Sequence, residues 1–209
     1  MLEYMDQGGS IMWIIAALSL AALAAAAERL IFFHKASVDV EKLEGDFGKA
    51  ISCGDAEGAW RVAKANDGSA NRLFVAALAH WGIGAEEMKL LMEQQVRREI
   101  YRWEKNLFVL EMIGKIAPLL GLLGTVLGMV AMFRSLHFGG QVNAAMVTGG
   151  IWKALFTTVA GLAVAIPTIM VYGFLNAKID SEEETLKRSA DFIVREHIAS
   201  GGGKDGAQK

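Results

Sequence analysis

The chain has 209 residues, of which 53% are hydrophobic, and a formal net charge of −2. The near-neutral charge provides no basic field for nucleic acid, and the single cysteine, Cys53, excludes a disulfide framework or a cysteine-based metal site within one chain. The mean hydropathy of +0.32 is high for a soluble domain, and only two prolines favour long, uninterrupted helices. The composition predicts an all-α integral membrane protein with a smaller polar part.

The first apolar block covers residues 11–33, "IMWIIAALSLAALAAAAERLIFF", and its first seventeen residues carry no charge. A cleaved signal peptide is the alternative interpretation, since Ala24–Ala27 resembles a cleavage site. A signal peptide begins with basic residues, however, and the only charged residues before the block are Glu3 and Asp6. We therefore predict an uncleaved transmembrane helix over 11–33 after a short segment, residues 1–10.

Residues 34–106 form a polar segment with helical periodicity. Three groups of turn residues, "CGD", "NDGS" and "GIG", separate short helices within it. Between Glu86 and Arg134 the only helix-breaking residue that we identify is Pro118. We therefore predict one long helix that extends roughly 45 Å beyond the membrane, at about 1.5 Å per residue. Charges of both signs between Glu93 and Glu104 predict a solvated helix surface.

Two further spans are predicted over residues 107–133 and 151–175. The second span ends with eighteen uncharged residues, and the third has 22 uncharged residues after Lys153. Each run is close to the roughly 20 residues that cross the hydrocarbon core of a bilayer. The fold class is therefore an all-α membrane protein with three transmembrane helices, long helices that leave the membrane and a helical hairpin region between the first two spans.

The distribution of basic residues predicts the orientation. The N-terminal segment and the loop 134–150 together contain one basic residue, Arg134, whereas residues 28–106 contain twelve and residues 176–209 contain six. Segments rich in Lys and Arg stay in the cytoplasm. We expect an inner-membrane protein with its N-terminus and the 134–150 loop in the periplasm, and with the segment 34–106 and the helical tail in the cytoplasm.

Small residues form one stripe along the second span and one along the third, both with spacings of three and four residues. Such stripes let helix backbones approach closely, because packing drives helix association within lipid. One stripe favours ordinary packing within a subunit, but two matched stripes favour an oligomer in which several copies share these faces. The stripes comprise Gly114, Ala117, Gly121, Gly124, Gly128 and Ala131, and Ala154, Thr158, Gly161, Ala165 and Thr168.

Two threonines lie on these faces. Thr125 is eight residues from the outer end of the second span and Thr158 is seven from that of the third, so both hydroxyls are expected roughly 10–12 Å deep, at one level. Each hydroxyl could bond only to its own helix, or the two could line a polar path for an ion or hold a partner helix. Glu111, near the inner end of the second span, either pairs with Lys115 or faces the same path.

No sequence motif indicates an enzyme, a cofactor or a metal site. The four histidines, His34, His80, His137 and His197, have no ligand spacing, and we expect them at surface or interfacial positions. No Asp, Glu or His lies in the deep part of a span, where a proton relay needs a titratable group. If the protein conducts protons, we expect a partner to supply the carboxylate.

The sequences "APLLGLLGTVLGM" (117–129) and "GIWKALFTTVAGLAVAIP" (150–167) closely resemble the two signature spans of the MotA/TolQ/ExbB proton-channel family. The resemblance is strongest to ExbB and TolQ. The three-span layout, the outer N-terminus, "ER" at 28–29 and the polar segment after it extend the resemblance over nearly the whole chain.

The resemblance implies an ion-channel subunit of an energy-transducing motor. In the family several copies, five in current models, surround single-span partners that are similar to ExbD or TolR and carry a membrane aspartate, and a TonB- or TolA-like protein that spans the periplasm is a further partner. The family's pore threonines correspond to Thr125 and Thr158, with Thr157 beside the latter. Pro118 and Pro167 are expected to interrupt helix hydrogen bonding, and Arg29 to anchor the first span.

One residue departs from the family pattern. "GIWKAL" places Lys153 where ExbB and TolQ have a glutamate in "GIAEAL". The charge near the outer mouth is reversed, so Lys153 either reaches the outer headgroups or pairs with an acidic group of the partner. The neighbouring Thr157 and Thr158 leave Na⁺ as an alternative ion, although the resemblance favours protons.

Two other functions are compatible with these features. A passive oligomeric membrane scaffold would use the small-residue stripes only for assembly, and it would explain the absence of ionisable groups deep in the spans without a partner. A solute transporter is the weaker alternative, since three spans without an internal repeat give little basis for alternating access.

Overall fold

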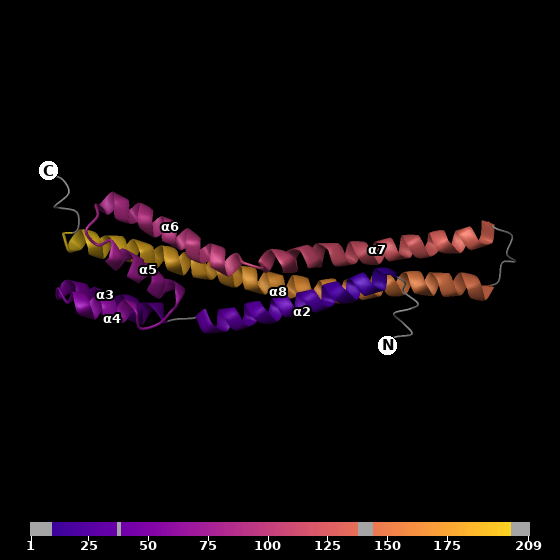
Figure 1. Cartoon of the computed structure of the whole chain (residues 1–209), viewed down its shortest axis with the longest axis horizontal. Coiled ribbons are helices and arrows are strands. Elements are labelled where there is room, and N and C mark those ends of the chain that lie inside the picture. The colour runs from indigo at the N-terminus through magenta and orange to yellow at the C-terminus, as the bar shows by residue number, and fades with distance from the viewer. Residues whose placement is uncertain (1–9, 37–38, 138–143, 202–209) are drawn as a thin grey trace. The chain divides into compact units, whose positions relative to one another are not determined.

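The structure, a computed structural model of the chain, describes residues 10–36, 39–137 and 144–201; for residues 34–36, 135–137 and 144–147 it describes only the backbone. The described residues form seven helices and no strand (Figure 1), so the predicted all-helical fold class is confirmed. The helices are α2 (Ser10–Ala36), α3 (Val40–Ser52), α4 (Ala56–Ala63), α5 (Ser69–Ala79), α6 (Ala85–Glu104), α7 (Leu107–His137) and α8 (Ala144–Ala199).

Three of these helices are long and apolar enough to cross a membrane, as predicted: α2, α7 and α8. Alanine and leucine, both strong helix formers, dominate α2. Its 27 residues extend roughly 40 Å at about 1.5 Å per residue, which exceeds the roughly 30 Å hydrocarbon core. Helix α7 continues to His137 and α8 begins at Ala144, so helical structure extends into the segment 134–150 that the sequence analysis treats as a loop.

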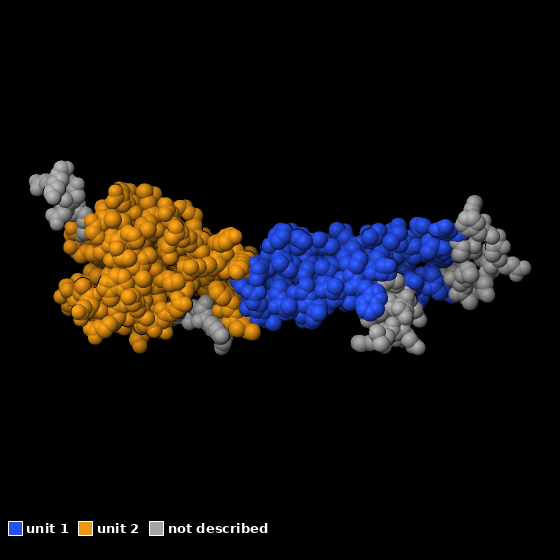
Figure 2. All heavy atoms as spheres, viewed as in Figure 1, with its two compact units in different colours: residues 1–30, 106–175 blue, residues 31–105, 176–209 orange. Residues whose placement is uncertain are grey.

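The chain divides into two compact units (Figure 2). Unit 1 comprises residues 1–30 and 106–175, and unit 2 comprises residues 31–105 and 176–209. Unit 1 therefore contains the apolar part of each membrane-length helix, whereas unit 2 contains the short helices and the charged end of α8. Helices α2 and α8 contribute residues to both units.

Aromatic side chains build the core of unit 2. Phe47 of α3 and Phe74 of α5 are fully buried, with ring centroids 4.6 Å apart, and Phe74 also contacts Phe192 of α8 at 6.3 Å. A second cluster joins Phe33 to Trp103 of α6, with centroids 4.6 Å apart in an edge-to-face arrangement. These rings bury a large apolar area, the main source of stability for such short helices.

The "CGD" turn of the sequence ends one helix and starts the next. Gly54 has a φ of +69°, a left-handed conformation that glycine adopts without strain. The following Asp55 caps α4, because its Oδ1 accepts a hydrogen bond from the backbone N–H of Gly58 at 2.8 Å. Asp39 caps α3 in the same way through the N–H of Lys42. Each cap stabilises its helix by about 1 kcal/mol.

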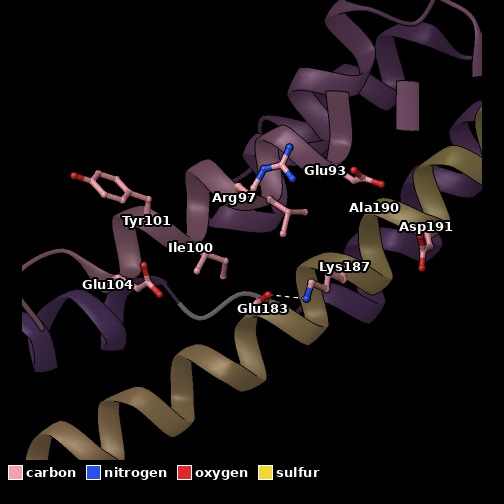
Figure 3. A pocket seen from close by; sticks show the side chains of 10 residues that line it. Glu93, Arg97, Ile100, Tyr101, Glu104, Glu183, Lys187, Ala190 and Asp191 are labelled. Atoms are coloured by element: carbon pink, nitrogen blue, oxygen red, sulfur yellow. Dashed lines mark ion pairs between the residues drawn. The ribbon is translucent and has the colours of Figure 1, made fainter. Parts of the chain in front are cut away.

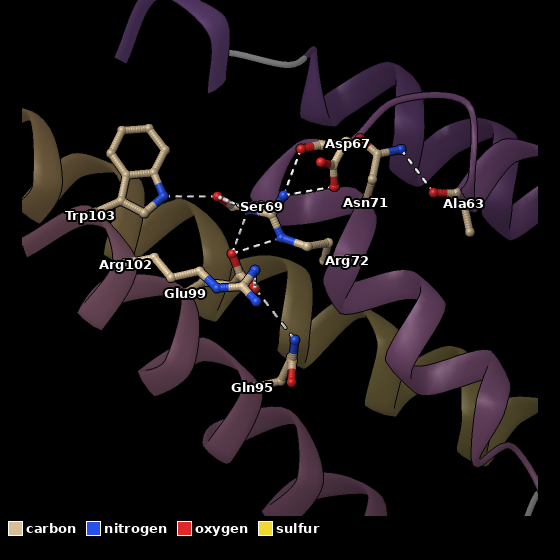
Figure 4. Close-up of polar contacts among 9 residues, drawn as sticks. All are labelled: Ala63, Asp67, Ser69, Asn71, Arg72, Gln95, Glu99, Arg102 and Trp103. Atoms are coloured by element: carbon tan, nitrogen blue, oxygen red, sulfur yellow. Dashed lines mark hydrogen bonds and ion pairs between the residues drawn. The ribbon is translucent and has the colours of Figure 1, made fainter. Parts of the chain in front are cut away.

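A buried ion-pair network connects α5 and α6 (Figure 4). Glu99 has no exposed surface, and its Oε2 accepts hydrogen bonds from Arg72 Nε and Nη2 at 3.0 and 2.7 Å, while Oε1 accepts one from Arg102 at 3.0 Å. The hydrogen bond to Glu99 raises the pKa of the Arg72 guanidinium above its ordinary value. The predicted mixed-sign helix surface between Glu93 and Glu104 therefore does not include Glu99, which is buried against α5 with two cations as partners.

The predicted continuous helix over 86–134 is also wrong, because the chain breaks between α6 and α7 at Lys105 and Asn106. Asn106 has a φ of +64°, in the left-handed region that asparagine tolerates better than most side chains. Its amide Nδ2 donates a hydrogen bond of 2.7 Å to Glu28 Oε2 of α2. The backbone conformation and this tertiary hydrogen bond together end the helix without a glycine or a proline.

His197 differs from its expected surface or interfacial position. Its side chain is fully buried in unit 2, where Nε2 donates a hydrogen bond of 2.9 Å to the carbonyl oxygen of Trp81, and the two rings lie edge to face. His80 is exposed and bonds to the carbonyl of Ala76. The side chains of His34 and His137 lie outside the described residues. His197 thus joins the end of α8 to the segment between α5 and α6.

Candidate functional site

The small-residue stripes of α7 and α8 pack against each other within one chain. A Cβ atom added to Gly161 would lie 2.5 Å from the carbonyl oxygen of Ala117, and one added to Gly121 would lie 3.0 Å from the Cα of Thr158. Only glycine permits so close an approach of two backbones. The expectation that several copies share these faces is therefore wrong, because the stripes cover one another. The buried members are Gly114, Ala117, Gly121, Gly124, Ala154, Gly161, Ala165 and Thr168.

Two neighbouring hydroxyls meet one backbone carbonyl where the helices are closest. Thr157 and Thr158 of α8 both donate hydrogen bonds to the carbonyl oxygen of Gly121 in α7, at 3.4 and 3.1 Å. Thr157 is 1% exposed and shares its proton with the carbonyl of Ala154 at 2.7 Å. Thr158 is half-buried. The missing side chain of Gly121 gives both threonines access to its carbonyl.

Thr125 lies beside this contact rather than in it. Its hydroxyl donates to the carbonyl of Leu122 at 2.7 Å, within its own helix, and its side chain is half-buried. The Thr158 hydroxyl donates to the carbonyl of Gly121, and the Thr125 hydroxyl donates to the carbonyl of Leu122. These two carbonyls are consecutive along α7, about 1.5 Å of rise apart, so the two hydroxyls lie at nearly the same level, which agrees with the expected common level.

The site provides oxygen atoms without charge. Each threonine hydroxyl donates its proton to a carbonyl and keeps lone pairs that can accept a hydrogen bond or coordinate a cation. Within the described parts of α7 and α8 that belong to unit 1, the only acidic residue is Glu111. Fourteen residues, about 21 Å of helix, separate Glu111 from Thr125. In their described residues these helices therefore place no carboxylate beside the hydroxyls.

Glu111 pairs with Lys115 one turn further along α7. Lys115 Nζ donates to Glu111 Oε1, and the side chains are 72% and 35% exposed respectively. Of the two alternatives raised by the sequence, the i, i+4 pair is the one that the structure contains. Such an exposed pair contributes little to the stability of a helix.

Lys153 and Thr157 line one crevice of about 400 Å³ in unit 1, together with Ser10 of α2 and the glycines Gly124 and Gly128 of α7. The spacing of four residues places Lys153 and Thr157 on the same face of α8. The i, i+4 spacing of Lys153 and Thr157 was the signal in the sequence for this arrangement, although the prediction joined Thr157 only to Thr158. The atypical lysine thus adjoins the buried hydroxyl.

Both prolines lie inside helices that continue beyond them. Pro167 has no N–H to donate to the carbonyl of Ala163. Ala163, Pro167 and Thr168 line a cavity of about 210 Å³ with Ser19 of α2. The hydroxyl of Thr168 donates to the carbonyl of Val164 at 2.7 Å, so that proton is already used within α8.

The polar contacts around Glu28 and Arg29 in unit 1 were not predicted from the sequence. Arg29 is 4% exposed and donates to Glu28 at 2.8 Å, while the other oxygen of Glu28 accepts the hydrogen bond from Asn106. Through Glu28 the "ER" pair is therefore joined to the residue that precedes α7. No local pattern could reveal this contact, because Glu28 and Asn106 are 78 positions apart.

A sequence model of the MotA/TolQ/ExbB proton channel family matches residues 65–188. The chain belongs to this family. The match covers α5, α6, α7 and most of α8, and so includes Lys153 and the three threonines of the site. The predicted resemblance to MotA/TolQ/ExbB proteins is confirmed.

Curated relatives carry ExbB names. The chain is 30% identical over 187 residues to a biopolymer transport protein ExbB homolog of Methanothermobacter thermautotrophicus, covering 89% of this chain and 66% of the relative. It is 34% identical over 179 residues to the ExbB-like 1 protein of Synechocystis sp., covering 84% and 70%. Biopolymer transport protein ExbB of Helicobacter pylori is 42% identical over 83 residues, covering 40% of this chain and 57% of that protein. Membership in the ExbB branch at the family level follows.

Proposed function

We propose that the chain is an ion-conducting subunit of an inner-membrane motor that couples proton flow to mechanical work on envelope or transport partners. The observation that carries the proposal is the pair of hydroxyls from Thr157 and Thr158 at the Gly121 carbonyl, inside apolar helices. These hydroxyls keep lone pairs that can line a polar path for an ion between the helices. The family match and the ExbB relatives support a proton channel.

The proton carrier in this proposal is an aspartate on a single-span partner of the ExbD or TolR type. The helices of unit 1 have no carboxylate beside the threonines in their described residues, so a second chain must supply it. The resemblance to the family's pore threonines assigns Thr125 and Thr158 to the flanks of that aspartate. Na⁺ is the alternative ion, because hydroxyl and carbonyl oxygens can also coordinate it.

The outer face of α7 supports a homo-oligomer. Leu119, Leu122 and Val130 are 63%, 58% and 55% exposed, on the side away from the glycine stripe. Of the most apolar 18-residue stretch of α7, only 17% is buried within the chain. The rest is a large apolar surface that can face lipid or further subunits. We propose that bulky side chains of this face, rather than the glycine stripes, meet neighbouring copies in a pentamer of the family type.

The proposed topology places the N-terminus in the periplasm and unit 2 in the cytoplasm. Its support is the excess of Lys and Arg in the two polar segments of unit 2. With this orientation Lys153 lies near the periplasmic mouth, and a TonB- or TolA-like effector would act on that side.

The experiment that tests the ion path compares two threonine variants in proteoliposomes that contain the partner. Thr158→Val removes a hydroxyl that reaches α7, whereas the control Thr168→Val removes one that bonds only within α8. We expect proton flux, measured with a pH-sensitive dye, to fall at least tenfold in Thr158→Val and to change less than twofold in the control. Normal flux in an assembled Thr158→Val complex would overturn the assignment.

A passive scaffold is the second candidate, favoured by the absence of a carboxylate beside the threonines in the described helices. Extraction from native membranes in mild detergent, followed by mass spectrometry of the intact complex, separates the two functions. A multimer with a single-span protein that has an aspartate in its span supports the motor. A homo-oligomer without such a partner, under conditions that preserve other membrane complexes, supports the scaffold.

A further inference from the structure

Unit 2 contains a groove between α6 and α8 that the proposed ion path does not use (Figure 3). Its volume is about 610 Å³, and its floor is formed by Val96, Ile100 and Ala190, which are 5%, 9% and 7% exposed. Tyr101, 75% exposed, stands at one end. A narrow apolar floor between charged rims is suited to an extended or helical segment with an apolar face.

The rim of this groove is acidic. Its six charged residues are Glu93, Glu104, Glu183, Asp191, Arg97 and Lys187. Lys187 and Glu183 pair with each other at 2.6 Å. The remaining charges are three carboxylates and one guanidinium, so the rim carries a formal charge of −2. This field attracts a basic ligand and repels the anionic headgroups of the cytoplasmic leaflet.

One end of the groove is close in sequence to the start of a membrane-length helix. Glu104 precedes the first residue of the second membrane-length helix, Leu107, by three positions. The groove follows α6 from Glu104 back to Glu93, a distance of eleven residues or roughly 16 Å. A segment that leaves the membrane beside this helix would therefore meet the groove within about one turn.

We propose that the groove binds the basic cytoplasmic flank of the single-span partner, a Lys- and Arg-rich amphipathic segment next to its membrane span. The inference rests on the proposed function, because it needs such a partner. A span whose flank stays in the cytoplasm carries Lys and Arg there. Their aliphatic stems cover an apolar floor while their charged ends reach the carboxylates of the rim. The groove thus holds the partner outside the bilayer while its aspartate lies inside.

Peptide binding to the full-length protein in neutral detergent tests the chemistry of the groove. The probe is a fluorescein-labelled amphipathic peptide of fourteen leucines and lysines, compared with one of leucines and glutamates. We expect the triple variant Glu93→Gln, Glu104→Gln, Asp191→Asn to weaken binding of the lysine peptide at least tenfold. The control triple Glu41→Gln, Glu57→Gln, Glu86→Gln removes the same charge from exposed sites elsewhere, and should change binding less than twofold. Equal affinities of both triples would overturn the assignment.

Site-specific photo-crosslinking in native membranes tests the occupant. A photoreactive residue at Tyr101 is compared with one at Leu90, which is 57% exposed on the same helix but outside the groove. We expect the Tyr101 position alone to crosslink to the basic flank of a single-span protein. Crosslinks to a second copy of this chain, to lipid, or equally from both positions would overturn the proposal.

The two proposals fail separately in these experiments. Proton flux that persists while both triples bind the peptide equally removes the groove assignment and leaves the motor intact. Isolation of a complex without a single-span protein overturns the motor proposal itself, whatever the peptide experiment shows.

Discussion

Units 1 and 2 satisfy their polar groups in different ways. In unit 1, hydroxyl groups such as those of Thr157 and Thr158 donate to backbone carbonyls, and glycines bring the helices together. In unit 2, Glu99 accepts from two arginines and Trp103 Nε1 donates to Ser69 Oγ at 2.8 Å. The contact of α7 with α8 therefore relies on backbone approach, whereas the contact of α5 with α6 relies on side chains that bond across helices, as Glu28 and Asn106 also do in unit 1.

This difference predicts opposite sensitivities. Helices in lipid gain little from burying apolar area, so close packing holds them, and an added methyl group separates them. Short helices in water depend on buried rings and paired charges, so the loss of one partner leaves a polar group without compensation. Unit 1 should therefore respond most to atoms that are added, and unit 2 to groups that are removed.

The largest effect is expected from Glu99→Ala in unit 2. It leaves the Arg72 and Arg102 guanidiniums without their shared carboxylate, which should destabilise the unit by about 3 kcal/mol, the lower end for a broken buried pair, because both arginines also reach solvent. The measurement is the thermal midpoint of the full chain in mild detergent. Glu57→Ala, at an exposed position, is the control and should shift it little. Equal shifts would show that the network does not stabilise unit 2.

The matching test in unit 1 adds one methyl group. Gly161→Ala places a Cβ 2.5 Å from the Ala117 carbonyl and should destabilise the α7–α8 contact by about 1–3 kcal/mol. Gly173→Ala, in the same helix, meets no atom within 4 Å and should be neutral or slightly stabilising. Aggregation temperature in detergent reports both. If the two variants behave alike, backbone approach does not hold unit 1 together.

Much of the fold could be predicted because it depends on one-dimensional properties. The apolar blocks at 11–33, 107–133 and 151–175 set the spans by length alone, and turn residues such as Gly54 end short helices locally. The left-handed Asn106 could not be predicted, since its hydrogen-bond partner Glu28 is 78 positions away. Glu99 resembled a solvated charge because its partner Arg72 is on another helix.

The candidate site was predictable as a set of residues but not as a geometry. The periodicity of the sequence identified the helix faces that consist of small residues, and the threonines on them, in both spans. It could not decide whether the stripe of α7 packs on its own chain or on a copy, because either contact needs the same small residues. The hydrogen bond from Thr158 to the Gly121 carbonyl likewise depends on how the two helices are aligned, which the contact between Gly121 and Gly161 fixes.

A smaller effect is expected from Thr157→Val, which keeps the shape of the side chain and removes its hydroxyl. Hydrogen bonds inside membranes contribute about 0.6 kcal/mol on average, and this proton also bonds within its own helix. The thermal midpoint should therefore fall less than in Gly161→Ala, measured side by side. A fall as large as that of the glycine variant would mean that hydroxyls, and not backbone approach, stabilise unit 1.

The smallest effect concerns pH and the half-buried Glu182 in the unit 2 part of α8. Desolvation by burial raises the pKa of its carboxyl group, with Lys178 opposing the shift. The folded state therefore favours the protonated form, and the resulting stability is present below the unfolded pKa of about 4.3 and lost as pH rises through the folded pKa. Glu182→Gln should raise the thermal midpoint slightly at pH 7.5, and the difference from the parent protein should vanish near pH 4. A difference that is constant from pH 4 to 8 would show that charge burial does not act here, and that unit 2 is sensitive only to lost partners.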